Sequence, residues 1–78
     1  MPTIIRHTGI RVDIIPGDHV PPHVHVYGGG GQAVISLDLL KVRDVRGMRP
    51  ADVARARRLV AENRDKLLRK WGTWNGKG

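Results

Sequence analysis

Apolar and polar residues alternate in short runs through the first half of the chain, which is the pattern of β-strands. Glycine and proline interrupt the runs at Gly9, at Pro16-Gly17-Asp18 and at Arg46-Gly47. The four glycines Gly28–Gly31 form the tip of a predicted β-hairpin. We therefore predict four or five strands between residues 3 and 45, in these runs: Thr3–His7, Ile10–Ile14, His23–Tyr27, Gln32–Leu37 and Leu39–Val45.

Apolar residues in the second half recur at the spacing of an amphipathic helix. Pro50 suits the first helical turn, and Asp52 places a carboxylate near the positive end of the helix dipole. Gly72 is expected to end the helix, which predicts a helix over 50–71 and a loose tail over 72–78. The predicted apolar stripe comprises Val53, Ala56, Val60, Leu67 and Trp71.

Together the elements predict a single α+β domain over residues 1–78, an antiparallel β-meander of four to five strands packed against one C-terminal α-helix. No apolar run is long enough to span a membrane, so no membrane association is expected. The chain has no cysteine, which excludes disulfides and a thiol nucleophile. The first residues lack the pattern of a signal peptide, and we expect a cytoplasmic protein.

Positive charge is concentrated in the second half of the chain. Residues 1–40 hold 2 basic and 3 acidic residues (2 − 3 = −1), whereas residues 41–78 hold 12 basic and 4 acidic residues (12 − 4 = +8), which gives the net charge of +7. Such a field attracts polyanions and acidic partners. RNA is the expected polyanion, with DNA or an acidic protein as alternatives. A basic surface without a dedicated ligand remains the plainest interpretation.

Two histidines, His23 and His25, stand two residues apart on one predicted strand and so share a face. With Val24 and Val26 toward the helix, both imidazoles face away from the core, where they can bind phosphate, move protons near neutral pH or ligate a metal. Structural histidines beside a Pro-Pro turn are the alternative. A metal needs further ligands, and the nearby candidates match no standard zinc motif: His7, Asp18 and His19. We therefore predict no metal and no cofactor.

RNA cleavage by the ribose 2′-OH needs a base, an acid and a group that stabilises charge on phosphorus. We predict His23, His25 and Arg64 as the catalytic groups of a metal-independent ribonuclease, with Arg57 as a second phosphate-binding arginine. Arg57 and Arg64 flank the apolar stripe, so their alternative role is to cover the edge of the core. The predicted nucleic-acid-binding residues are Tyr27, Arg55, Arg57, Arg58, Arg69 and Lys70.

The glycine run Gly28–Gly31 is a second candidate for phosphate contact through its backbone amides. It lacks the Lys-Ser/Thr of a phosphate-binding loop and leads into a strand instead of a helix. We interpret it primarily as a mobile hairpin tip.

Several motifs occur in the same order in a family of small bacterial proteins: Met1-Pro2-Thr3-Ile4, Pro21-Pro22-His23-Val24-His25-Val26, Gln32-Ala33-Val34 and Val60–Trp71. On these motifs the chain resembles domain-of-unknown-function family 4160 over nearly its whole length. The resemblance implies a compact α+β domain. Members of that family often look like the toxin half of toxin–antitoxin pairs, encoded beside a small partner protein. The resemblance implies no settled reaction and no assigned catalytic residue.

The residues and the resemblance together predict the toxin component of a toxin–antitoxin pair, which binds RNA and cleaves it through a His/Arg site without metal. Its expected partner is a cognate small antitoxin-like protein of acidic character. Two alternatives stay open. One is a non-catalytic basic module that binds nucleic acid or an acidic protein, and the other is a metal-binding protein that uses His23 and His25.

Overall fold

The computed structural model describes residues 3–15 and 21–75, without the side chains of Thr3 and Trp74. The turn predicted at Pro16-Gly17-Asp18 and the candidate ligands Asp18 and His19 lie outside the described residues, as do Met1-Pro2 and the end of the tail at 76–78.

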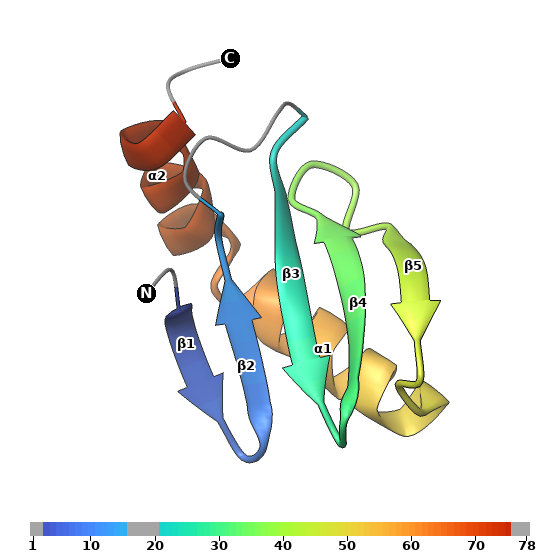
Figure 1. Ribbon diagram of the computed structural model, residues 1–78. Helices are drawn as coiled ribbons and strands as arrows, with labels where there is room; N and C mark the ends of the chain where they lie inside the picture. The colour runs from blue at the N-terminus through green and yellow to red at the C-terminus, as the bar shows by residue number, and fades with distance from the viewer. Residues whose placement is uncertain (1–2, 16–20, 76–78) are drawn as a thin grey trace.

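Five antiparallel strands follow one another across a single sheet in the order β1-β2-β3-β4-β5, and two helices follow them in the chain (Figure 1). In Figure 1, helix α1 crosses behind the sheet, and no described helix covers the near face. The predicted α+β meander is confirmed. Its elements are β1 (Thr3–His7), β2 (Ile10–Asp13), β3 (His23–Gly28), β4 (Gly31–Ser36), β5 (Val42–Arg46), α1 (Pro50–Glu62) and α2 (Arg64–Asn75).

The helical half contains two helices where we predicted one. At Asn63 the side-chain amide donates to the carbonyl oxygen of Leu59, the acceptor that the Asn63 backbone N–H would use in a continuous helix. That N–H donates to Val60 and Ala61 instead, and α1 ends. The chain then restarts as α2, which continues through Gly72 to Asn75, so the tail predicted from residue 72 is wrong for 72–75. Within the described residues, neither helix has the length and apolarity needed to cross a bilayer.

The core lies between the sheet and the helices. Val12 on β2 and Val24 and Val26 on β3 are fully buried, as the alternation in these strands predicts. The predicted helical stripe meets them, with Val53 partly buried at its edge. Its fully or almost fully buried members are Ala56, Val60, Leu67 and Trp71. Burial of this stripe orients both helices against one face of the sheet and leaves the other face without a helical cover.

Two features of the structure explain why glycines stand between β3 and β4. Gly29 and Gly30 both have positive φ, +58° and +82°, as a two-residue hairpin turn requires. Gly31 packs directly on the backbone after β5: a Cβ there would lie 2.3 Å from the carbonyl carbon of Gly47 and 2.4 Å from the nitrogen of Met48. The hairpin tip is therefore tied to the start of the helical half through a contact that only glycine permits.

Arginines of the helices hold the loop between β4 and β5. Arg64 donates from Nε to the carbonyl oxygen of Leu37 at 2.5 Å and from an η nitrogen to that of Asp38 at 3.3 Å. Arg57 donates from Nε to the carbonyl oxygen of Leu40 at 2.9 Å. Leu40 has a φ of +54°, which is costly for a residue with a Cβ. The hydrogen bond from Arg57 to its carbonyl oxygen holds the backbone in this conformation.

Arg55 holds the turn between β1 and β2 in the same way. Its η nitrogen donates to the carbonyl oxygen of Thr8 at 2.5 Å, and the guanidinium also pairs with Asp52 at 3.1 Å. Thr8 has a φ of +46°, which a β-branched residue adopts only at a cost. Arg55, Arg57 and Arg64, which we call the clamp arginines, thus connect the helices to the sheet's loops by charge-assisted hydrogen bonds.

We expect Arg64→Ala to lower the free energy of unfolding by about 1–3 kcal/mol, because it leaves two loop carbonyls without a cationic donor. The matched control is Arg69→Ala, an exposed arginine of the same helix, for which we expect a change under about 0.5 kcal/mol. Urea unfolding followed by circular dichroism measures both. Equal stability of the two variants would contradict the clamp role of Arg64.

We expect Gly31→Ala to destabilise the fold by about 1–3 kcal/mol, because its new methyl group overlaps the Gly47 backbone. The same substitution at Gly72 meets nothing within 4 Å in helix α2 and should stabilise the protein by about 0.5–1 kcal/mol. Melting temperatures of the two variants should therefore move in opposite directions from that of the parent. A shift of the same sign in both would show that the hairpin tip does not pack as described.

Candidate functional site

The face of the sheet opposite helix α1, which we call the open face, is defined by strand register. Val12 pairs with Val26 under the helix, so the neighbouring pairs Arg11–Tyr27 and Asp13–His25 point the other way. His23 follows on β3, and its partner on β4 is Ser36. The prediction that the two imidazoles share a face opposite to Val24 and Val26 is confirmed for the strand positions.

Four arginines from three strands lie on the open face. Arg6 on β1 pairs with Arg11 on β2, and on β5 Arg43 pairs with Val34 while Arg46 pairs with Gln32. Residues directly opposite in an antiparallel pair point to the same face. Arg6, Arg43 and Arg46 are exposed and Arg11 is half-buried, so this face carries cationic charge that solvent and ligands can reach.

The two histidine rings contact each other, with centroids 5.3 Å apart in an edge-to-face arrangement. His23 also packs against Trp71 of α2, with centroids 5.1 Å apart, so its ring lies where the end of the sheet meets that helix. Nδ1 of His23 lies 2.7 Å from the carbonyl oxygen of Pro21. Because a carbonyl only accepts, Nδ1 carries the proton, and Nε2 is the nitrogen that accepts a proton in the neutral ring.

A buried carboxylate stands beside this pair. Asp13 is 3% exposed and lies directly opposite His25. Its Oδ1 pairs with Nε of Arg11 at 3.3 Å. The Arg11 guanidinium carbon in turn lies 4.3 Å from the centre of the Tyr27 ring, a cation–π contact. Asp13 therefore orients an arginine on one side and neighbours a histidine on the other.

The helix residues that we predicted as ligands lie elsewhere. Because α1 covers the face opposite to His25, the sheet separates His25 from Arg55, Arg57 and Arg58. Arg64, predicted as catalytic, donates to the carbonyls of the β4–β5 loop. Arg69 and Lys70 are exposed on α2. Of the predicted residues, the structure brings together His23, His25 and Tyr27 on one strand.

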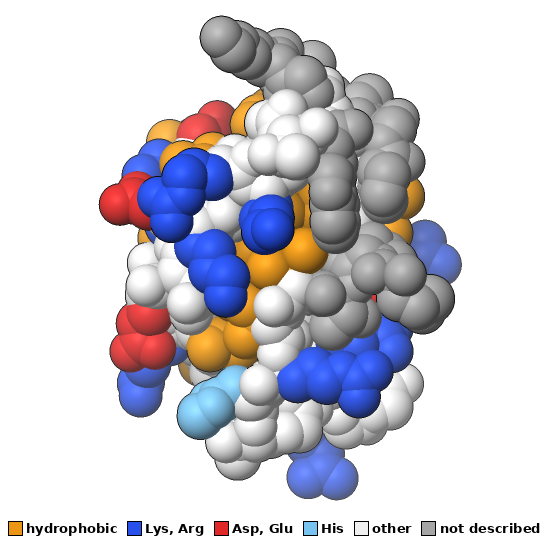
Figure 2. Space-filling view, turned by 90° about the vertical axis from the view of Figure 1, so that its left-hand side faces the viewer, with side chains coloured by type: hydrophobic (Ala, Val, Ile, Leu, Met, Phe, Trp, Pro, Cys, Tyr) orange, Lys and Arg blue, Asp and Glu red, His pale blue; other side chains and the backbone are white. Residues whose placement is uncertain are grey.

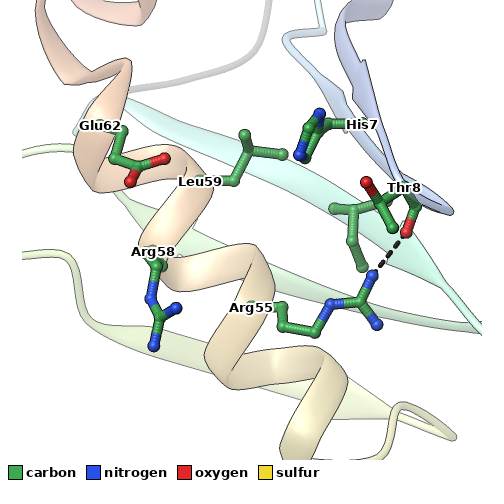
Figure 3. Close-up of a pocket in the computed structure, with 7 residues that line it drawn as sticks. His7, Thr8, Arg55, Arg58, Leu59 and Glu62 are labelled. Atoms are coloured by element: carbon green, nitrogen blue, oxygen red, sulfur yellow. Dashed lines mark hydrogen bonds between the residues drawn. The ribbon is translucent and has the colours of Figure 1, made fainter.

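A pocket of about 290 Å³ lies between α1 and the β1–β2 turn (Figure 3). Its walls include His7, Arg55, Arg58 and Glu62, with Leu59 directed toward His7. The Arg55 guanidinium is held on the Thr8 carbonyl, and that of Arg58 points away from His7. Seen from the β1 edge, basic side chains surround an apolar area of the surface (Figure 2). The charged side chains of this pocket therefore do not converge on one point where they could bind a ligand together.

A metal site needs at least three converging ligands. Among residues 3–15 and 21–75, no group of three His, Asp or Glu side chains is placed to hold a metal ion. The candidates Asp18 and His19 lie outside that part of the chain.

Sequence analysis missed Asp13 and all four arginines of the open face. The signal for Arg11 and Asp13 was present, because Ile10-Arg11-Val12-Asp13 alternates and so places both on one face of a strand. Their pairing with Tyr27 and His25 depends on the β2–β3 register, which the intervening residues do not reveal.

Comparison with known proteins identifies the family of this chain. A family model described as Domain of unknown function (DUF4160) matches residues 9–72. No curated protein and no solved structure matches the chain. The matched range contains strands β2 to β5, helix α1, most of α2 and both histidines of the open face. By this match, which extends over most of its 78 residues, the chain belongs to the DUF4160 family.

Proposed function

We propose that this protein binds single-stranded RNA on the open face and cleaves it there, as the toxin component of a cytoplasmic toxin–antitoxin pair. The observation that carries the proposal is the placement of two contacting imidazoles, a buried carboxylate and four arginines on the open face, with His23 at its boundary with α2. On the helix side, by contrast, the clamp arginines hold backbone carbonyls.

RNA binding is supported by the surface chemistry of this face. RNA-binding domains with antiparallel sheets stack unpaired bases on aromatic residues of the central strands. Tyr27 occupies such a position on β3, and the Arg11 guanidinium lies over its ring, so a base would stack on the guanidinium plane. Arg6, Arg43 and Arg46 stand on the flanking strands, where the phosphates of a strand lying across the sheet would pass.

Cleavage requires two proton transfers. Nε2 of His23 takes the proton of the ribose 2′-OH, whose oxygen attacks phosphorus, and the bond to the 5′-oxygen breaks. His25 protonates the departing 5′-oxygen, which gives a 2′,3′-cyclic phosphate and a 5′-hydroxyl end. Asp13 stands opposite His25 in the strand register, and Arg11 offers positive charge to the phosphorane. In this scheme Arg11 takes the role that we predicted for Arg64.

The partner in this proposal is a small acidic antitoxin-like protein that neutralises the toxin by covering its positive surface. An acidic protein competes with RNA for the same arginines, so one interaction excludes the other. The same face also suits a non-catalytic module that binds RNA or DNA, and turnover is what separates the two functions.

We expect the full-length protein to cleave single-stranded RNA in the presence of a metal chelator and to leave 2′,3′-cyclic phosphate ends. His23→Ala and His25→Ala should each lower the rate by about 100-fold or more, because each removes one proton-transfer group. His7→Ala is the matched control: its partner Ile10 is buried, which places His7 on the helix-covered side, and its rate should equal that of the parent.

In cells, induced expression of the parent should arrest growth, and the His23→Ala, His25→Ala double variant should not. Growth arrest of equal strength by the double variant would show that the imidazoles are not the catalytic groups. RNA binding without turnover would favour the non-catalytic module.

We expect RNA affinity to fall steeply with salt, with a log–log slope of about −3 if the four open-face arginines each contact a phosphate of a single strand. Arg43→Ala should reduce the slope by about 0.7. Arg69→Ala, which removes an exposed arginine from α2, should leave the slope unchanged. Fluorescence anisotropy at increasing salt measures the slopes, and the reverse outcome for the two variants would place RNA on the helices.

A further inference from the structure

A second pocket lies at the hairpin end of the open face. Its volume is about 600 Å³, and its walls are Arg11, Tyr27, Gln32, Arg46, Gly9 and the glycine tip Gly28–Gly31. It is distinct from the pocket beside α1, with which it shares no lining residue. Tyr27 is two residues from His25, so the pocket lies about 6.6 Å along β3 from the proposed cleavage site.

The cationic groups of this pocket are oriented and available. Arg11 is fixed by its Nε contact with Asp13 and by the Tyr27 ring, and no described residue accepts a hydrogen bond from its terminal nitrogens. Arg46 is exposed at the end of β5 and makes no ion pair with a described residue. Two carboxylates of neighbouring elements, Asp13 and Asp52, are each paired with an arginine. The two guanidinium groups thus offer donors for an anion.

The remaining walls suit the rest of a nucleotide. Gln32 lies directly opposite Tyr27, so a side-chain amide with both donors and an acceptor stands beside the aromatic ring. The Gly29-Gly30 turn has no side chain to keep a ligand from the backbone, and its positive φ values turn the chain sharply at this point. A stacking surface, an amide and two phosphate donors in one pocket match a nucleoside phosphate better than a simple anion.

We propose that this pocket binds one nucleotide of the RNA, with its phosphate on Arg46 and Arg11, its base against the Arg11–Tyr27 pair and its base edge on Gln32. This inference rests on the proposed function, because the bound nucleotide would be the neighbour of the one cleaved between the histidines. The pocket thereby selects single-stranded RNA: a base in a duplex is already stacked and paired and cannot enter.

Adenosine 5′-monophosphate tests the pocket without any need for cleavage. In a calorimetric titration of the full chain, the nucleotide should bind more tightly than either adenosine or inorganic phosphate. Arg46→Ala should weaken nucleotide binding about tenfold, the loss of one charge-assisted contact. Gln32→Ala should bring nucleotide affinity closer to that of phosphate.

Arg43→Ala is the matched control for Arg46→Ala. Both are exposed arginines of β5 on the open face, but only Arg46 lines the pocket. Nucleotide affinity of Arg43→Ala should stay within about twofold of the parent, a difference of under 0.5 kcal/mol. If the two variants lose the same nucleotide affinity, the nucleotide is held by general charge attraction and the proposal is overturned. Inorganic phosphate that binds as tightly as the nucleotide would overturn it too.

The outcomes also separate this pocket from the proposed function. Protein that binds the nucleotide as expected but never cleaves RNA would keep the pocket and reject the ribonuclease. Protein that cleaves RNA while Arg43→Ala and Arg46→Ala bind the nucleotide equally would keep the ribonuclease and reject the pocket.

Discussion

Hydrogen bonds from helix arginines to backbone carbonyls hold the two layers of this fold in place. Thr8 and Leu40 have positive φ without being glycine, and each has its carbonyl oxygen bound by a clamp arginine. Strain in a turn persists only where the surroundings oppose its relaxation. A small sheet with a thin core gains fixed turns in this way, and strand register then follows from the turns.

This constraint decides which arginines still have guanidinium donors to offer a ligand. The helical half has the larger net charge, yet Arg55, Arg57 and Arg64 already share their guanidinium groups with the protein's own backbone. The sheet contributes fewer cations, but register gathers them on a face without a helix. The net charge of a segment therefore does not show which of its cations remain available, because a cation that satisfies a carbonyl has less to offer a phosphate.

Much of the fold could be predicted from sequence because it depends on local periodicity. Alternation placed Val24 and Val26 in the core, and the 3.6-residue repeat identified the buried stripe that ends at Trp71. The break at Asn63 escaped prediction because no Gly or Pro marks it, only a side chain that competes with its own backbone. The carbonyl acceptors of the clamp arginines could not be predicted either. A helical wheel shows the side of the helix on which an arginine lies, but not the group that it binds.

The candidate site is built around one buried carboxylate, that of Asp13, whose neighbours depend on strand register. The ion pair between the buried Asp13 and the half-buried Arg11 contributes little to stability compared with apolar side chains of similar size, so the core does not require it. The role of Asp13 is instead to orient a neighbouring side chain. It fixes the Arg11 guanidinium over Tyr27, which forms a wall of the hairpin pocket, and it stands opposite His25. One carboxylate on β2 thus lies between the arginine and the histidine to which our proposal assigns base stacking and proton transfer.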